Sequence, residues 1–439
     1  MRRIGHALVQ VAGGLMRGHG WLLLPLLALL VGLRIADWRP FALTRDNLFD
    51  WYQTIAPPAP SSDRVVVVEI DEASLAALGQ WPWSRAVLAE LTKRLTEAGA
   101  IVGFDMVFAE PDRLSPDRLA AVLPHLDPAV ARALAVEPNT DRLFAQAIAG
   151  GRVVLGQGFE APGAPPLRSV ATIALSRRSA DAFLEPHRGL VNPLPVLAQA
   201  AAGSGFFKAG VQTEDGVVRH LLTLAMVQDH VVPSLALELA RVAQATDDVT
   251  VKVSPFGISG LTFGGIAVPT GRASEIWPNF STAAPRTLSA IAVLDRSAAA
   301  ESLAGRIAIV GASAVGLMDV QQTPIGRMPG VYLHARAVDN MLSGNLLWRP
   351  PWYKPLEIAL MIAGGLIVVV AAGFFGRRVV VAAWLTMIVL GFGGSYALFA
   401  IGRLLIDPSA AVIAATALVF VILLIGALRQ DRPAPAIAR

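Results

Sequence analysis

The chain has 439 residues, of which 54% are hydrophobic and only 16% carry a charge, and its formal net charge is +4. An average soluble domain has roughly 25% charged residues, so this composition excludes an ordinary soluble protein. The absence of cysteine excludes disulfides, thiolate metal sites and cysteine nucleophiles. The small net charge, with arginines beside apolar segments, argues against a nucleic-acid-binding surface.

The first apolar segment, residues 18–36, predicts a transmembrane helix after a cytoplasmic N-terminus of residues 1–17. A cleaved signal peptide is the alternative, because Arg2 and Arg3 precede the apolar run. No small-x-small cleavage site follows the run, which ends in Arg34-Ile-Ala-Asp37. The pattern therefore favours an uncleaved membrane anchor.

Residues 37–353 have the composition of a soluble domain, and about 315 residues are enough to bury a large core. After a polar spacer at residues 56–62, the β-branched run from Arg64 to Asp71 predicts a buried strand. Ser84 is a predicted helix cap for residues 84–98, and residues 100–108 predict a second strand. Strand, helix and strand in this order predict a βαβ unit with parallel strands.

The rest of this domain alternates between the two kinds of element. Helices are predicted at residues 139–149, 234–243 and 331–342, and strands at residues 152–156, 216–225, 250–253, 265–268 and 306–311. We expect the strands between 216 and 268 to be antiparallel. Residues 113–138 and 160–192 show no strong periodicity and are predicted insertions. The fold class expected is therefore mixed α/β with a partly parallel sheet.

Three more apolar segments follow, and each is long enough to cross a hydrocarbon core of about 30 Å. They are residues 356–375, 379–401 and 408–428, followed by a short tail of residues 429–439. Arg377 and Arg378 lie between the first two of these segments, and further arginines lie near both termini. The positive-inside rule therefore places both termini in the cytoplasm and residues 37–353 outside it. We expect a bacterial inner membrane protein with its large domain in the periplasm.

Acidic side chains follow several predicted strands. Ligands in open parallel sheets bind beyond the carboxyl ends of the strands. The acids at those places are Asp71, Glu72, Asp105, Glu110, Asp112 and Asp319. They predict a site for a cationic ligand or for Ca²⁺ or Mg²⁺, with Asp71, Asp105 and Asp319 as the candidate metal ligands. In the alternative interpretation these acids cap turns and helices or pair with Arg85.

The segment Gln80-Trp81-Pro-Trp83-Ser-Arg85 is a second candidate ligand surface. Two indoles and a guanidinium suit a flat or anionic ligand. The alternative is that both tryptophans close the hydrophobic core.

The segment Gly311-Ala-Ser-Ala-Val-Gly316 resembles a phosphate loop superficially, but Leu317 stands where a phosphate loop needs lysine. Ser313 remains a candidate hydrogen-bond donor to a ligand. His334 is a further candidate on a predicted helix, although a single histidine there is often structural. The chain has no Gly-x-Ser-x-Gly elbow and no HExxH motif, so neither a serine hydrolase nor a zinc site is supported.

Three stretches together resemble the second type of CHASE domain, the extracellular sensory domain of bacterial cyclases, histidine kinases and serine/threonine kinases. They are Val68–Arg85, Gly103-Phe-Asp-Met-Val-Phe-Ala-Glu-Pro-Asp112, and Val310–Asp319 continuing through Thr323-Pro324 to Met328-Pro-Gly-Val-Tyr-Leu-His-Ala335. The order of one span, a large domain and three spans also matches. The resemblance implies an outer sensor with an undefined ligand. Because only residues 429–439 follow the last span here, the enzymatic outputs of the family are not carried over.

These observations leave three functional hypotheses. The first is a receptor that binds an unidentified signal and relays it to a separate cytoplasmic or membrane partner, with a homodimer as a further option. The second is a membrane scaffold without a small ligand. The third is a metal-dependent extracytoplasmic hydrolase, against which the missing catalytic motifs argue; we expect no enzymatic activity.

Overall fold

The computed structural model describes residues 23–56, 62–123, 125, 127–166, 171–175, 178–207, 215–280, 283–298, 302–317 and 319–430. The chain divides into two compact units. One contains Met1–Ala56 and Trp352–Arg439, and the other contains Pro57–Pro351. Most of the predicted spacer at residues 56–62 lies outside the described residues.

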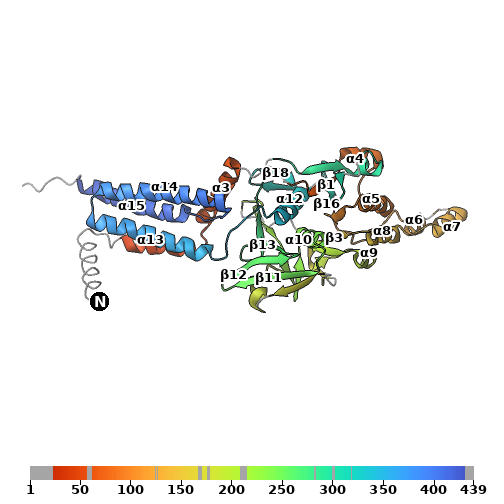
Figure 1. Cartoon of the computed structure of the whole chain (residues 1–439), viewed down its shortest axis with the longest axis horizontal. Coiled ribbons are helices and arrows are strands. Elements are labelled where there is room, and N and C mark those ends of the chain that lie inside the picture. The colour runs from red at the N-terminus through yellow and green to blue at the C-terminus, as the bar shows by residue number, and fades with distance from the viewer. Residues whose placement is uncertain are drawn as a thin grey trace, which may run out of the picture. The chain divides into compact units, whose positions relative to one another are not determined.

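A largely parallel sheet forms the centre of the second unit (Figure 1). Its strands are, in spatial order, β15 (Arg286–Ser289), β1 (Val65–Ile70), β16 (Ile307–Ala312), β2 (Ile101–Phe104), β3 (Val153–Ala164) and β7 (Gly203–Phe206). All of these pair in parallel, and the short β6 (Leu190–Val191) adds to β3 in antiparallel orientation. Continuous apolar runs such as Val65–Val68 are typical of strands covered on both faces. The predicted parallel βαβ unit is thus confirmed, with β16 inserted between its two strands.

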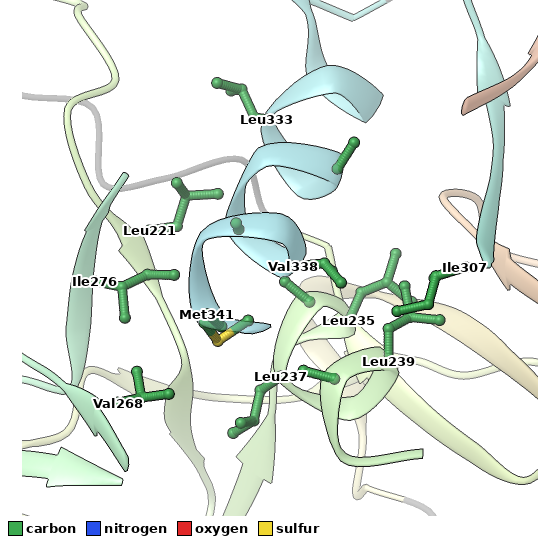
Figure 2. Close-up of a cluster of buried hydrophobic side chains, with 14 of the residues drawn as sticks. Leu221, Leu235, Leu237, Leu239, Val268, Ile276, Ile307, Leu333, Val338 and Met341 are labelled. Atoms are coloured by element: carbon green, nitrogen blue, oxygen red, sulfur yellow. The ribbon is translucent and has the colours of Figure 1, made fainter. Parts of the chain in front are cut away.

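Helices cover both faces of this sheet, and the strands alternate their side chains between the two layers. One layer contains α4 (Glu72–Leu78), α5 (Arg85–Glu97), α8 (Thr140–Ala149), α9 (Pro195–Ala200) and α11 (Ala290–Leu294). The other contains α10 (Leu235–Ala243) and α12 (Gly330–Ser343). Figure 2 shows Val338 and Met341 of α12 beside the leucines of α10. The central part of this unit is a three-layer α/β/α sandwich.

A smaller sheet packs on the layer of α10. It contains β4 (Thr172–Leu175), β11 (Asp248–Ser254), β12 (Gly257–Phe263) and β13 (Ile266–Pro269). The predicted strands β11 and β13 both pair in antiparallel orientation with β12, which the sequence did not predict, whereas β4 pairs in parallel with β11.

The remaining elements of this unit are short. They are α6 (Pro116–Val122), α7 (Pro128–Val136), the 3-10 helix η2 (Arg178–Phe183), β5 (Pro186–His187), β8 (Leu221–Leu222), β9 (Leu224–Val227), β10 (His230–Pro233), β14 (Glu275–Pro278), β17 (Val320–Thr323), β18 (Gly326–Pro329) and β19 (Leu346–Leu347). The sequence did not predict α6 and α7. None of the side chains of α7 is buried.

The first unit contains three helices that are long and apolar enough to cross a membrane. They are α13 (Tyr353–Phe374), α14 (Arg377–Gly402) and α15 (Ser409–Gln430), close to the predicted spans. The N-terminal span is described only as the 12-residue apolar helix α2 (Leu24–Ile35), because residues 18–22 lie outside the described part. Leu23 and Leu27 pack against α13 and α15.

Helix α3 (Arg39–Ile55) belongs to this first unit, although the sequence placed residues from 37 onward in the outer domain. Phe41 packs with Met361 and Ala410 of the bundle. Tyr52 lies against Phe399 with a ring separation of 5.3 Å and donates a hydrogen bond to Ser395 at 3.1 Å. The helix is amphipathic, and its apolar side is covered by α13, α14 and α15.

Candidate functional site: the carboxyl edge of the central sheet

The connections of the central sheet change direction around β16. Strands β1 and β2 lead into the helix layer of α5 and α8, whereas β16 leads to α12 in the opposite layer. In open α/β sheets, the crevice for ligands lies where neighbouring connections diverge in this way. The carboxyl ends of β1, β16 and β2 are therefore the expected position of a binding site.

Asp105 and His334 come together at this edge, although they are far apart in the sequence. Asp105 follows β2, and its Oδ1 lies 3.6 Å from Nε2 of His334 in α12. The same Nε2 lies 3.0 Å from the carbonyl oxygen of Phe207, just after β7, and donates to it. The His334 side chain is 3% exposed, and its Nδ1 has no hydrogen-bond partner in the described structure.

Asp319 completes the group. It is exposed, and its backbone carbonyl accepts a hydrogen bond from the Gly330 amide at 2.7 Å, where α12 begins. Burial raises the pKa of Asp105, the Asp319 carboxylate raises it further, and His334 opposes the shift. Since no described group donates a hydrogen bond to the Asp105 carboxyl, burial dominates its electrostatics.

The sequence analysis missed a second polar pair at this edge. Tyr332 of α12 donates a hydrogen bond to Oε1 of Glu69 in β1 at 2.6 Å. Burial and this hydrogen bond to Glu69 raise the pKa of the Tyr332 phenol. Glu69 is the single charged residue in an otherwise aliphatic strand, and this is the signal that could have identified it.

Three of the predicted ligand residues have structural partners instead. Asp71 caps α4, accepting hydrogen bonds from the Ser74 amide at 2.9 Å and from Ser289 Oγ at 2.8 Å. Burial opposes ionisation of Asp71, but these hydrogen bonds prevail and lower its pKa. Glu72 accepts from the Val315 amide at 2.8 Å, and the Ser313 amide donates to Ile70.

The hydrogen bonds to Glu72 and Ile70 come from the loop after β16, which resembles a phosphate loop. The backbone amides of residues 313, 314, 315 and 317 all donate within the protein. The loop therefore presents none of these four amides to an anion, in agreement with the absence of a phosphate-loop lysine.

Asp112 and Arg85 belong to a separate buried network. Asp112 accepts hydrogen bonds from the Arg85 amide at 2.7 Å and from Thr140 Oγ1 at 2.7 Å. Arg85 Nε lies 3.7 Å from Asp141, and its guanidinium stacks 4.6 Å above the Phe108 ring. The alternative interpretation of caps and an Arg85 pair thus describes Asp112.

The two tryptophans pack together and into the core. Their rings lie 5.5 Å apart, edge to face, and Trp83 Nε1 donates to the Gly79 carbonyl at 2.9 Å. Trp83 is buried and Trp81 partly so, both within the layer of α5. Glu110 is exposed. The structure thus brings together Asp105, Asp319 and His334, and separates them from Asp71, which makes its own hydrogen bonds.

No group of three or more histidine or acidic residues in the described ranges is arranged to hold a metal ion. Of the predicted metal candidates, Asp105 and Asp319 lie near each other, whereas Asp71 binds two serines. The residues of the edge therefore fit a ligand that offers a positive charge or hydrogen-bond donors.

Comparison with known proteins agrees with this architecture. The family model of the CHASE2 domain matches residues 24–372, which is most of the chain. Neither the curated proteins nor the solved structures contain a significant match. CHASE2 domains are sensory rather than catalytic, and the three stretches that suggested the resemblance all lie within the matched range. The chain therefore belongs to the CHASE2 family of extracellular sensory domains.

Proposed function

We propose that this chain is a membrane-anchored receptor that binds a small signal at the carboxyl edge of its central sheet and relays it to a separate protein. The observation that carries the proposal is the Asp105 carboxyl, whose side chain is only 13% exposed and to which no described group donates a hydrogen bond. A buried polar group without a partner costs free energy. A signal that supplies the missing donor would recover that cost and stabilise the site.

The chemistry of the site favours a cationic or hydrogen-bond-donating signal. Asp105 and Asp319 supply acceptor oxygens, and His334 supplies an unpaired ring nitrogen at Nδ1. A primary amine placed between the carboxylates would make charge-assisted hydrogen bonds, which are stronger than neutral ones. A divalent cation, Ca²⁺ or Mg²⁺, is the other signal of this class.

Helix α12 is the element suited to transmit binding. It carries His334 near its start, and its 14 residues extend about 21 Å at 1.5 Å per residue. Near its far end, the Ser62 amide donates to Asp339 at 3.2 Å and Arg64 Nη1 donates to the Leu342 carbonyl at 2.9 Å. Residues 62–64 begin the outer domain, and the chain after α12 continues into α13. Helix α12 thus connects the candidate site to residues 62–64 and to the chain that continues into α13, which are the two segments that lead to the helices of the first unit.

The proposed topology has four spans, α2, α13, α14 and α15, with the outer domain in the periplasm of a bacterial cell. Three of these helices have the necessary length and composition, and α2 packs against two of them. Arg377 and Arg378 at the start of α14 support a cytoplasmic position for that turn.

A ligand screen tests the proposal. The full chain in lipid nanodiscs is screened by thermal unfolding against primary amines, Ca²⁺ and Mg²⁺. A ligand at 100 times its dissociation constant stabilises the folded state by about 2.7 kcal/mol. Asp105→Asn should abolish that stabilisation. Glu110→Gln is the matched control, because Glu110 is an exposed acid following the same strand, and it should keep the effect. If no compound stabilises the unmodified chain, or if Asp105→Asn responds fully, the edge is not the binding site.

A further inference from the structure

A long apolar groove runs between α13 and α14 in the membrane unit. Its larger part has a volume of about 600 Å³ and is lined by Ala363, Gly364, Leu390, Gly394 and Leu398, with α15 closing one end through Pro408. A second hollow of about 410 Å³ continues it toward Phe375 and Val379. The two hollows share Ile367 and Ala383, so they form one groove.

The length of the groove points to a helix as its occupant. It extends from Leu398, near the end of α14, to Val379, near its start. Those 19 residue steps correspond to about 29 Å at 1.5 Å per residue. This is about the full hydrocarbon thickness of a bilayer. Two lipid chains, one from each leaflet, are needed to fill this length, whereas a single transmembrane helix fills all of it.

Glycines in this bundle show which close contacts are already made. A Cβ at Gly365 would collide with the Leu27 side chain, and one at Gly364 would lie 2.6 Å from Met387. Gly365 is thus used for packing within the chain, whereas Gly364 lines the groove beside the flexible end of the Met387 side chain. In contrast, Gly393 and Gly394 of α14 have no atom within 4 Å of a built Cβ. Small residues at membrane helix interfaces allow backbones to approach closely, and here that space is unfilled.

Helix α14 also carries an apolar ridge beside the groove. Leu385, Val389 and Gly393 recur every four residues, one helical position away from Leu390 and Gly394 of the groove wall. Val389 is 69% exposed. Only 11% of the most apolar stretch of α14 is buried, against 39% for α13 and 28% for α15. The least covered helix therefore presents both a ridge and half of a groove.

We propose that a second copy of this chain occupies the groove, with the α14 ridge of each copy seated between α13 and α14 of the other. Both copies insert into the membrane in the same orientation, so the twofold axis lies along the membrane normal. A ridge beside a groove on the same helix is self-complementary under such an axis, as an isologous interface requires.

The absence of cysteine makes cross-linking a clean test. Single cysteines are placed at successive positions from Leu385 to Gly394 of the full chain, and membranes are oxidised. Cross-linked dimer should peak at Val389, Leu390, Gly393 and Gly394, at least tenfold above Phe420→Cys. Phe420 is the control because it is exposed on α15 and does not line the groove. A uniform yield along α14, or an equal yield at Phe420→Cys, overturns the proposal, as does an adduct with the mass of a different protein.

A pair of glycine variants separates docking from folding. Gly394→Leu fills open space and should reduce the dimer at least tenfold by mass measurement in nanodiscs while the chain stays folded. Gly365→Leu collides with the buried Leu27 side chain, away from the groove lining, and should lower the thermal stability of the chain itself. A Gly394→Leu chain that remains dimeric, or an unmodified chain that is monomeric with lipid in the groove, contradicts the interface.

Discussion

Asp105 and Asp112 are both largely buried carboxylates that follow the same strand, yet their surroundings shift their pKa values in opposite directions. Burial raises the pKa of Asp105 because no described donor compensates for lost solvation. Burial also acts on Asp112, but hydrogen bonds from Thr140 and from the amides of Arg85 and Leu114 prevail and lower its pKa. The Asp112 carboxylate is thus held by hydrogen bonds, whereas no described group donates a hydrogen bond to the Asp105 carboxyl.

Replacement of each acid by asparagine should therefore change the pH dependence of stability with opposite sign. The pKa of Asp105 is higher in the folded state than in the unfolded state, where it is near 4. Its contribution to the free energy of unfolding is therefore fully present below about pH 4 and is lost as the pH rises through the folded-state pKa. An asparagine side chain does not ionise, so the stability of Asp105→Asn relative to the unmodified chain should increase as the pH rises above about 4 and level off above the raised folded-state pKa of Asp105. Thermal unfolding followed by tryptophan fluorescence at several pH values measures this difference.

The pKa of Asp112 is instead lower in the folded state. Its contribution to the free energy of unfolding is therefore present above about pH 4 and is lost as the pH falls through the folded-state pKa. Asp112→Asn should cost about 1–3 kcal/mol near neutral pH, because the amide leaves buried donors unpaired. This loss of stability in Asp112→Asn should become smaller as the pH is lowered. If both variants show the same pH trend, the two environments do not differ in the way described.

At the scale of elements, buried charges join α2 to α13 and to the start of α15. Arg34 Nη2 donates to Glu357 at 2.6 Å, and both side chains are at most 2% exposed. The Asp407 amide donates to the other oxygen of Glu357 at 2.8 Å. The network fixes the rotation of α2 against α13, which is the first helix after the unit of residues Pro57–Pro351.

Removing one member of this pair should destabilise the bundle more than removing both. Arg34→Met alone removes the positive charge that faces the buried Glu357 carboxylate, which costs about 3–5 kcal/mol. Glu357→Met alone should cost less, because Arg34 keeps its ion pair with the half-exposed Asp37 at 2.7 Å. The double variant replaces the pair by apolar side chains of similar size and should recover most of that loss. Thermal unfolding in nanodiscs measures the coupling, and additive effects of the two changes would show that the pair is not energetically linked.

At the scale of the whole molecule, the apolar helices and the arginines in their short connections predict a membrane topology. Reporter fusions after Ala56 and near residue 350 should be active only outside the cytoplasm, whereas fusions at Arg377 and after Arg429 should be active only inside it. The physical reason is the arginine content of the short connections. A fusion near residue 350 that reports the cytoplasm would contradict both the topology and the position of the sensor.

Several features of this protein follow from the sequence because they depend on neighbouring residues. Apolar runs defined α13, α14 and α15, since a membrane-spanning helix satisfies its own backbone. The all-aliphatic run at β1 indicated a strand covered on both faces, and Ser84 marked the start of α5 by capping it. The carboxyl edge of the sheet was also predicted, because parallel strands end on the same side.

Only the tertiary structure decided which acids share that edge. Insertion of β16 between β1 and β2 joins segments about 200 residues apart, and α12 then brings His334 to Asp105. Asp71 and Asp112 have the same local pattern as Asp105, but serines and backbone amides from distant elements complete their hydrogen bonds. Likewise, Gly365 and Gly394 look equivalent in sequence, and only the packed helices distinguish the position filled by Leu27 from the open one. Local patterns specify which surfaces are buried, whereas the partner across each surface depends on long-range packing.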